Sequence, residues 1–332
     1  MTETRPTSAD VAREAGVSRA TVSYVLNGAA RNISAETQAR VKDAATRLGY
    51  ISHGPAKTLK VGYSDVVLLA IPPWPLGPPV AEWISTASRA IGELGYTPLI
   101  HHEQEHSPAD LARICQAIRP VGVIAPSSHF RPGILAEVRA SGARAVIAYG
   151  EQQVPNVPTL VGPQEEVGAC AARYLAQRGH REILALMPAD KDLVDLGLRR
   201  SAGAAAACQE HGITYRAITS QIEMRAVAAA LRQAMPNGRW PSAIFAFNDE
   251  CALMAIRCLA AADIRVPVDI AVLGCDNSPM ARLTEPPLTS VKFRITESWQ
   301  NLIESLGRMI DGEELPAVMN GMDVTIAVRQ SA

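Results

Sequence analysis

The stretch that decides the fold of the N-terminal region is TSADVAREAGVSRATVSYVLNG, residues 7–28. Its apolar residues recur at helical spacing on both sides of Gly16, and Thr7 with Asp10 forms the pattern of a capping box. A second helix is expected after Ser18, which can cap it. Two helices joined by a short turn that contains glycine form the helix-turn-helix motif of DNA-binding proteins.

A third helix is expected from Ser34 to Gly49, which makes residues 1–50 an all-α headpiece. Residues 1–60 contain nine basic and five acidic side chains, a net charge of +4, whereas the rest of the chain carries −5. A small basic unit on a larger acidic body fits a nucleic-acid-binding head joined to a body that need not touch DNA.

The second helix is expected to bury Val22, Val25 and Leu26. Its opposite face is then available to base edges in the major groove, where arginine can pair with guanine and alanine can touch a thymine methyl group. Hydroxyl groups near the helix N-termini are suited to phosphates. A plain three-helix bundle with a solvated surface remains the alternative from these residues alone. The residues expected at bases or phosphates in this headpiece are Thr7, Ser18, Arg19, Ala20, Thr21, Ser23, Tyr24 and Asn27.

The run Asp10–Gly28, with the later Arg47–Tyr50, resembles the headpiece of the lac-repressor (LacI/GalR) family. This resemblance implies that Arg19, Ala20 and Tyr24 read bases in a double-stranded DNA operator. Most members have arginine at the position of Tyr24, so the base pairs that this residue faces are left open.

Residues 51–62 are expected to form a linker. In the family, a short hinge helix at this point inserts a leucine into the minor groove. Ala56–Leu59 resembles that hinge, which implies DNA contacts for Lys57 and Leu59. An apolar wedge of this kind unstacks a base step and kinks the duplex. The alternative for Leu59 is an ordinary linker residue that packs on the body.

Residues 63–332 alternate short apolar runs with amphipathic stretches. That alternation predicts parallel sheets covered by helices. The predicted strands are Val66–Ile71, Val121–Ala125, Ala145–Ala148, Ile183–Met187, Ala243–Phe247 and Ile270–Leu273, and the clearest helices are Ala81–Leu94, Glu165–Arg178 and Glu250–Ala262.

The resemblance continues through Gly179–Ile183, Ala246–Asp249, Val266–Asn277 and Pro286–Val291. It implies a periplasmic-binding-protein-like α/β body of two parallel-sheet lobes, with ligand bound at the carboxyl ends of the strands. Lobe 1 is expected at about 63–161 and 292–320, and lobe 2 at about 162–291 and 321–332. No heptad pattern follows the strand-like Val324–Val328, so a homodimer is expected rather than a tetramer.

Three polar positions match the family's effector contacts, namely Arg200, Asn248 and Asp276. Such a set can hold vicinal hydroxyls or a nucleobase edge, so a sugar-like small molecule is expected and a nucleobase is the alternative. A helix cap or an ion pair is the structural alternative for each position. In lobe 1, Trp74 and Phe293 could stack on a ring or pack on neighbours. Gly150 stands where some members have an acid.

Several function classes are disfavoured. The run His101–His106 invites a metal, but a solvated loop is expected there and no metal site. The chain contains no catalytic triad pattern, phosphate loop or dinucleotide motif, so neither catalysis nor a cofactor is expected. It has no apolar run long enough for a membrane span and no signal peptide, which predicts a cytoplasmic protein rather than an exported solute receptor.

Overall fold

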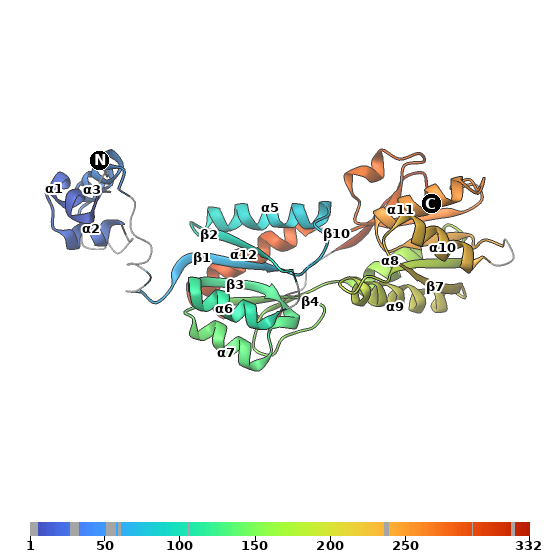
Figure 1. The fold of residues 1–332 in the computed structure, drawn as a ribbon, viewed down its shortest axis with the longest axis horizontal. Coiled ribbons are helices and arrows are strands. Elements are labelled where there is room, and N and C mark those ends of the chain that lie inside the picture. The colour runs from blue at the N-terminus through green and yellow to red at the C-terminus, as the bar shows by residue number, and fades with distance from the viewer. Residues whose placement is uncertain are drawn as a thin grey trace.

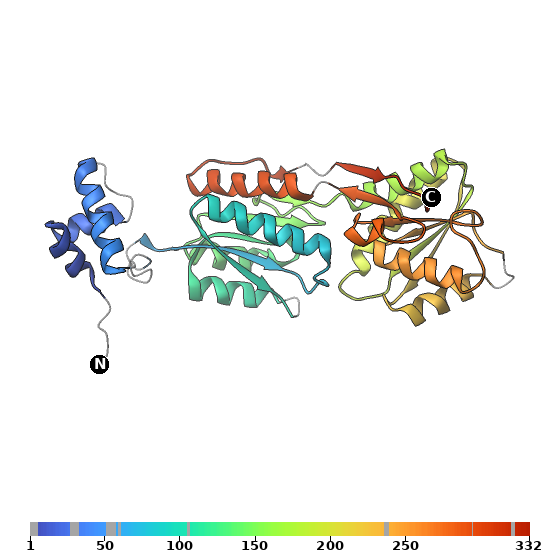
Figure 2. The ribbon, with the colours of Figure 1, turned by 90° about the horizontal axis from the view of Figure 1, so that it is seen from above.

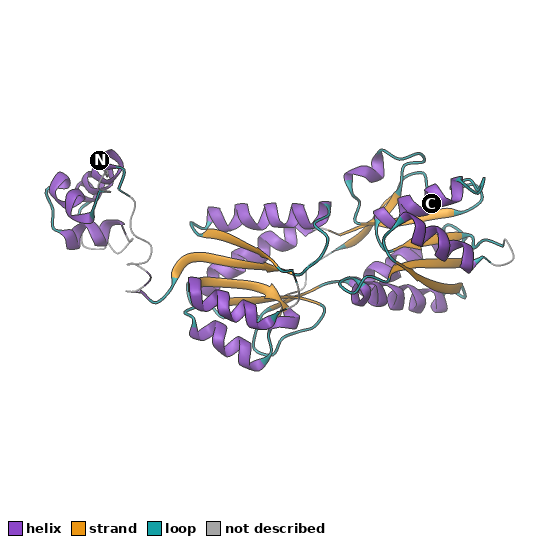
Figure 3. Ribbon diagram, in the orientation of Figure 1, coloured by secondary structure: helices purple, strands orange, loops and turns teal. Residues whose placement is uncertain are grey.

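The structure, a computed structural model, describes residues 6–26, 33–50, 58, 61–104, 107–235, 239–293, 295–319 and 323–332. A three-helix headpiece, lobe 1 and lobe 2 follow one another along the long axis of the molecule (Figures 1 and 2). Each lobe is a sheet with helices on both faces (Figure 3). The predicted fold class, an all-α headpiece on a body of two mostly parallel sheets, is confirmed.

The headpiece consists of α1 (Ser8–Ala15), α2 (Arg19–Leu26) and α3 (Ala35–Leu48). Local signals set these bounds. The backbone nitrogen of Thr7 donates to the Asp10 carboxylate at 2.9 Å, and Gly16 ends α1 with a left-handed φ of 63°. The Ser18 hydroxyl accepts from the backbone nitrogen of Thr21 at 3.0 Å and so begins α2. The helices enclose a small core of Val11, Ala12, Ala15, Val22, Val25, Val41, Ala44 and Ala45.

Lobe 1 contains a sheet in the order β11-β5-β4-β3-β1-β2, in which every strand pair among the described residues is parallel. Its central strands are buried along nearly their whole length, as expected for a sheet covered on both faces. The strands are β1 (Ser64–Ile71), β2 (Thr97–His102), β3 (Pro120–Pro126), β4 (Ala145–Gly150), β5 (Thr159–Val161) and β11 (Val318–Met319), and the helices are α5 (Pro78–Glu93), α6 (Pro108–Ile118), η1 (Ser127–His129), α7 (Pro132–Ala140) and α12 (Ile295–Ile310).

Lobe 2 contains a sheet in the order β12-β10-β9-β8-β6-β7, in which only the β10–β12 pair is antiparallel among the described residues. The chain changes sheet after β5, after β10 and after β11, so three segments join the lobes. The strands are β6 (Glu182–Pro188), β7 (Thr214–Ser220), β8 (Ala243–Ala246), β9 (Ala271–Cys275), β10 (Thr289–Phe293) and β12 (Val324–Ala327), and the helices are α8 (Gln164–Gln177), α9 (Val194–Glu210), α10 (Met224–Ala234), α11 (Asp249–Ala260) and η2 (Pro279–Arg282).

The expected solvated loop at His101–His106 is wrong for the part that the structure describes. His101 and His102 end β2, whose residues pair with β1. Glu103 is buried, and its carboxylate lies 2.8 Å from the Nε2 atom of buried His129. The run therefore includes the end of an edge strand and a buried polar pair, because pairing with β1 carries Glu103 into lobe 1. Residues 105 and 106 lie outside the described part.

Close packing of α8 on α9 holds lobe 2 together where it meets lobe 1. A Cβ atom added at Gly168 would overlap the backbone carbonyl oxygen of Arg200, and one added at Gly203 would overlap the carbonyl oxygen of Glu165. Only glycine therefore permits this approach at either position. The contact fixes the helix that carries Arg200 directly against the helix that begins at Gln164.

We expect G168A and G203A each to lower the free energy of unfolding by about 1–3 kcal/mol, because backbone atoms would have to move apart. The matched control is G92A in α5, where an added methyl group meets nothing within 4 Å. That change should leave stability unchanged or raise it by up to about 1 kcal/mol. Urea unfolding measures all three, and equal effects at the three positions would contradict this packing.

Candidate functional site

The outward face of α2 is accessible in the headpiece. Arg19, Ala20 and Tyr24 are exposed, and Tyr24 retains 49% of its accessible surface, whereas Val22 and Val25 are buried. The expected division of this helix into a core face and an outward face is confirmed. Two further predicted contacts, Thr21 and Ser23, are half-buried, and three others lie outside the described residues, namely Asn27, Lys57 and Leu59.

The hydroxyl groups expected at phosphates already have partners within the headpiece. The Thr7 hydroxyl donates to the Asp10 carboxylate at 2.7 Å. The Ser18 and Thr21 hydroxyl oxygens lie 2.9 Å apart, and Ser18 also caps α2. These side chains are exposed or half-buried at helix N-termini, where backbone N–H groups favour anions. Any phosphate contact would therefore be shared with a capping bond.

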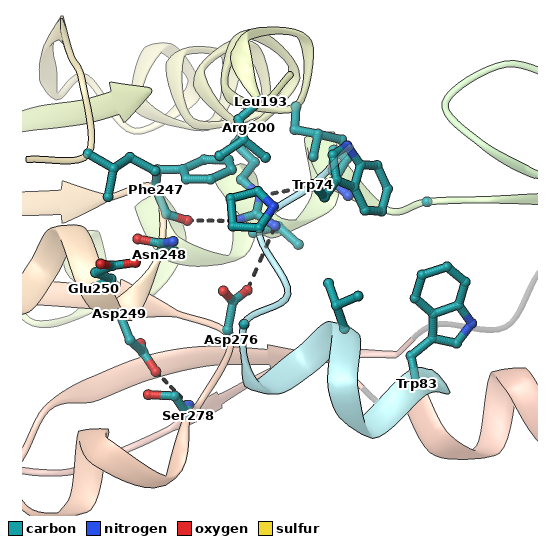
Figure 4. A pocket seen from close by; sticks show the side chains of 18 of the residues that line it. Trp74, Trp83, Leu193, Arg200, Phe247, Asn248, Asp249, Glu250, Asp276 and Ser278 are labelled. Atoms are coloured by element: carbon teal, nitrogen blue, oxygen red, sulfur yellow. Dashed lines mark hydrogen bonds and ion pairs between the residues drawn. The ribbon is translucent and has the colours of Figure 1, made fainter. Parts of the chain in front are cut away.

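A cavity of about 640 Å³ lies between the lobes, at the carboxyl ends of both sheets (Figure 4). Its volume is within the range of small-molecule sites. The wall from lobe 1 is largely aromatic, and the wall from lobe 2 carries most of the polar groups. Four of the five side chains expected to bind ligand line it: Trp74, Arg200, Asn248 and Asp276. The backbone of Phe293 ends β10, but its side chain lies outside what the structure describes.

Arg200 is the buried cation of this cavity, only 4% exposed. Its Nε donates to the Gln164 side-chain oxygen at 2.7 Å, and a second nitrogen donates to the Phe247 carbonyl oxygen. The guanidinium carbon lies 4.5 Å from the centre of the Phe247 ring, and the Asp276 carboxylate is 3.9 Å from the guanidinium. A buried charge needs such compensation. Arg200 is consequently held rigidly, with little freedom to take up a large anion.

Asp276 and Asn248 stand at the ends of two neighbouring strands, β9 and β8. Burial raises the pKa of Asp276, and the nearby Arg200 acts in the opposite direction. The Asn248 side-chain oxygen accepts from the backbone nitrogen of Cys251 at 2.9 Å, so this residue caps α11. The structural role anticipated for Asn248 is therefore present. Its amide nitrogen takes no part in that cap.

Asp249 is a buried cavity residue that inspection of the sequence did not single out as a ligand contact. Its carboxylate accepts from the Ser278 backbone nitrogen and from the Ser290 hydroxyl, both at 2.6 Å. Burial raises its pKa to about 6. These bonds tie the start of α11 to the loop after β9 and to β10. Asp249 thus fixes the loop that presents Asp276.

Glu151 is the second polar residue that the sequence reading missed. Gly150 has a φ of 137°, and a Cβ atom there would lie 2.8 Å from the Ser127 hydroxyl, so an acid does not fit at that position. The next residue, Glu151, lines the cavity instead, with its carboxylate 3.6 Å from Arg199. Burial raises the pKa of Glu151 to about 7. The available signal was an acid three residues beyond the end of the predicted strand Ala145–Ala148.

Three aromatic rings in lobe 1 line the cavity together: Trp83, Tyr149 and Trp299. Their ring centres lie 4.5–5.3 Å apart, and each side chain is at most 5% exposed. The Trp83 indole N–H has no hydrogen-bond partner among the described residues. Trp74 packs against the cores of both lobes, and its carbonyl oxygen lies 3.2 Å from the His102 ring. The three buried rings make this wall apolar, and the half-buried Trp74 is the ring with surface available to a ring-shaped ligand.

In the part of the chain that the structure describes, no three or more His, Cys, Asp or Glu side chains gather in a way that could hold a metal ion. Within the same ranges, no helix has both the length and the apolar character needed to cross a membrane.

A helix-turn-helix headpiece on a two-lobed body with a ligand-sized cleft defines a DNA-binding regulator with a sensor domain. Residues 7–53 match the model of bacterial regulatory proteins of the lacI family, and residues 172–332 match that of a periplasmic binding protein-like domain.

Two similar transcriptional repressors agree with this class. The chain is 32% identical over 294 residues to the HTH-type transcriptional repressor PurR of Pectobacterium carotovorum, covering 85% of this chain and 84% of the relative. It is 32% identical over 323 residues to PurR of Yersinia enterocolitica, covering 92% and 91%.

Solved structures show the same architecture. The transcriptional regulator CelR in complex with cellobiose is similar with a TM-score of 0.68 and 27% identity, covering 99% of this chain and all of that one. The lac repressor dimer bound to operator and the anti-inducer ONPF has a TM-score of 0.81 and 23% identity, covering 99% of both chains. The chain belongs to the lacI family of bacterial regulatory proteins and is a DNA-binding transcriptional regulator.

Glu151 gives the body a distinctive pH dependence. Its pKa is raised from 4.5 to about 7, so between these values the folded protein holds a proton that the unfolded chain releases. The free energy of unfolding should therefore fall as pH rises through this interval. We expect E151Q to weaken that fall, leaving the part due to the other buried acids with raised pKa values, Asp249 and Asp276. Urea unfolding at about pH 5 and about pH 7 measures it.

The matched control is E313Q. Glu313 also contacts an arginine, Arg308 at 3.0 Å, but its side chain is 52% exposed and it does not line the cavity. This variant should keep the pH dependence of the unaltered protein. An E151Q protein whose stability changes with pH as much as that of the unaltered protein would contradict the assignment.

Proposed function

We propose that the protein is a transcriptional repressor that binds a two-fold symmetric DNA operator as a homodimer and responds to a small molecule in the interlobe cavity. It acts in the cytoplasm, where the DNA is. The observation that carries the proposal is the exposed Arg19-Ala20-Tyr24 face of α2, in a chain 32% identical to transcriptional repressors over most of its length.

In this proposal, α2 contacts base edges, with Arg19 directed toward a guanine. The N-termini of the headpiece helices contact phosphates. Ser23 and Asn27 extend the reading face. In the linker, Lys57 and Leu59 contact the DNA backbone and the minor groove at the centre of the operator. The headpiece spans residues 1–50 and the linker 51–62, and the rest of the chain forms the body.

Dimer formation has support from a structure with the same fold. The similar lac repressor structure is a dimer bound to operator. Two identical heads would read two half-sites related by the dimer axis.

An effector can weaken or strengthen DNA binding only if it binds one arrangement of the lobes more tightly than another. The cavity is formed by both lobes, so a bound molecule changes the free energy of closing them. Arg200, Asn248, Asp276 and Glu151 would meet the polar groups of this molecule, and Trp74 its ring. We assign Phe293 to the same site because an aromatic residue at the end of β10, where the chain crosses between the lobes, could stack on a ring.

The effector in this proposal is an uncharged ring compound with hydrogen-bond donors. Five acids line the cavity against the guanidinium of Arg200, two of whose nitrogens already donate to Gln164 and to the Phe247 carbonyl oxygen, so a phosphorylated ligand would be repelled. A sugar is supported by the cellobiose complex of the similar CelR. A nucleobase is supported by Trp74, a half-buried ring in the cavity wall that could stack on a flat ring. The five acids are Glu151, Asp190, Asp249, Glu250 and Asp276.

For the DNA-reading role, we expect R19A to lose about 1–3 kcal/mol of binding to a duplex enriched from a random pool by the unaltered protein. It should also relax base preference at one position of each half-site. R40A in α3 is the matched control, since it removes an exposed charge away from α2. Equal losses of affinity for the two variants, with base preference unchanged, would contradict the role of Arg19 in base recognition.

For the sensor role, thermal unfolding is measured with matched pairs: glucose and glucose 6-phosphate, adenosine and adenosine monophosphate. We expect stabilisation from an unphosphorylated member, by about 2.7 kcal/mol when its concentration is about 100 times Kd. R200A should abolish it. Greater stabilisation by the phosphorylated member of a pair would contradict the proposal that the effector is uncharged.

A further inference from the structure

We propose that Arg119 and Gly142 fix the direction of the chain at Gly62, where the linker ends and the body begins. They thereby couple the cavity to the DNA-binding headpieces. We call these two residues, with Arg144, the linker clamp. The proposal rests on the proposed function, because it concerns how the state of the cavity reaches the DNA.

Arg119 holds the chain on both sides of Tyr63. Its side-chain Nε donates to the carbonyl oxygen of Gly62 at 2.8 Å, and its own carbonyl oxygen accepts from the Ser64 nitrogen at 2.7 Å. The residue follows α6 with a φ of 49°, in the left-handed region that costs about 1–2 kcal/mol for a residue with a side chain. The surrounding contacts therefore enforce this conformation at the point where the body begins.

Gly142 supplies the second half of the clamp. It has a φ of 108°, and an added Cβ atom would overlap the carbonyl oxygen of Gly62. Any side chain at this position would push the chain away from lobe 1. Arg144 adds a third contact, since its guanidinium donates to the Tyr63 hydroxyl at 3.3 Å and lies 5.8 Å from the ring centre. Three segments far apart in the sequence thus meet at residues 62–63.

The same segments lead directly to the cavity. β1, β3 and β4 are parallel neighbours, and they begin next to the clamp at Ser64, Pro120 and Ala145. Beyond their carboxyl ends stand Trp74 and Glu151, which line the cavity, and Ser127 beside Gly150. Figure 2 shows β1 running into lobe 1 from the headpiece end. A rotation of lobe 1 about the cavity would therefore turn the clamp, and with it the chain at Gly62.

The experiment compares full-length variants on two duplexes: the full site enriched by the unaltered protein, and a duplex with one half-site only. We expect G142A to lower the ratio of full-site to half-site affinity at least tenfold, because the heads are no longer held in register. G95A is the matched control. It lies in the same lobe with a φ of 83°, and an added methyl group meets nothing within 4 Å.

R119A should lower the same ratio, whereas R113A on the exposed face of α6 should not. If G142A does not fold, the comparison of R119A with R113A decides. A purely structural role would reduce both affinities together with the thermal midpoint and leave the ratio unchanged, which would overturn the clamp. A failure of the unaltered protein to enrich any duplex would contradict the proposed function instead.

Discussion

The cavity between the lobes depends on one buried charge, the guanidinium of Arg200. Removing such a charge from water costs several kcal/mol unless partners compensate it. Gln164, the Phe247 carbonyl and ring, and Asp276 supply that compensation. These partners come from α8, β8 and β9, so the need to neutralise one cation fixes three elements of lobe 2 relative to one another.

The close packing of α8 on α9 makes this arrangement possible. Because Gly168 lies directly against the Arg200 carbonyl, the two helices approach more closely than residues with a Cβ atom would allow. The guanidinium then reaches the carboxyl ends of the parallel strands, where loops from both sheets face each other. Lobe 1 contributes aromatic rings and Glu151 to the same space. Because both lobes line the cavity, its shape depends on how the lobes are set.

The headpiece and the central strands could be predicted from the sequence because their signals are local. Thr7, Gly16, Ser18 and Gly49 mark helix ends by side-chain caps or a left-handed turn, and each acts there in the structure. Central strands such as Val121–Ala125 are continuous apolar runs. The edge strands β2 and β7 escaped prediction because neither contains a continuous run of buried apolar residues.

The cavity was predictable only in part. Arg200, Asn248 and Asp276 stand in motifs that match the family. Glu151 and the Trp83–Tyr149–Trp299 cluster depend on contacts between residues far apart in the chain, which no local pattern reveals. The same holds for the buried pair of Glu103 and His129, where a polar run in the sequence suggested a loop.

The most direct test of the account is hydroxyl-radical footprinting of the purified full-length protein on a duplex that it has enriched. Two equivalent heads predict two protected segments related by two-fold symmetry, about one helical turn or a multiple apart, with a distorted centre between them. Protection of a single segment, or uniform protection without symmetry, would contradict a dimer that reads DNA through paired α2 helices.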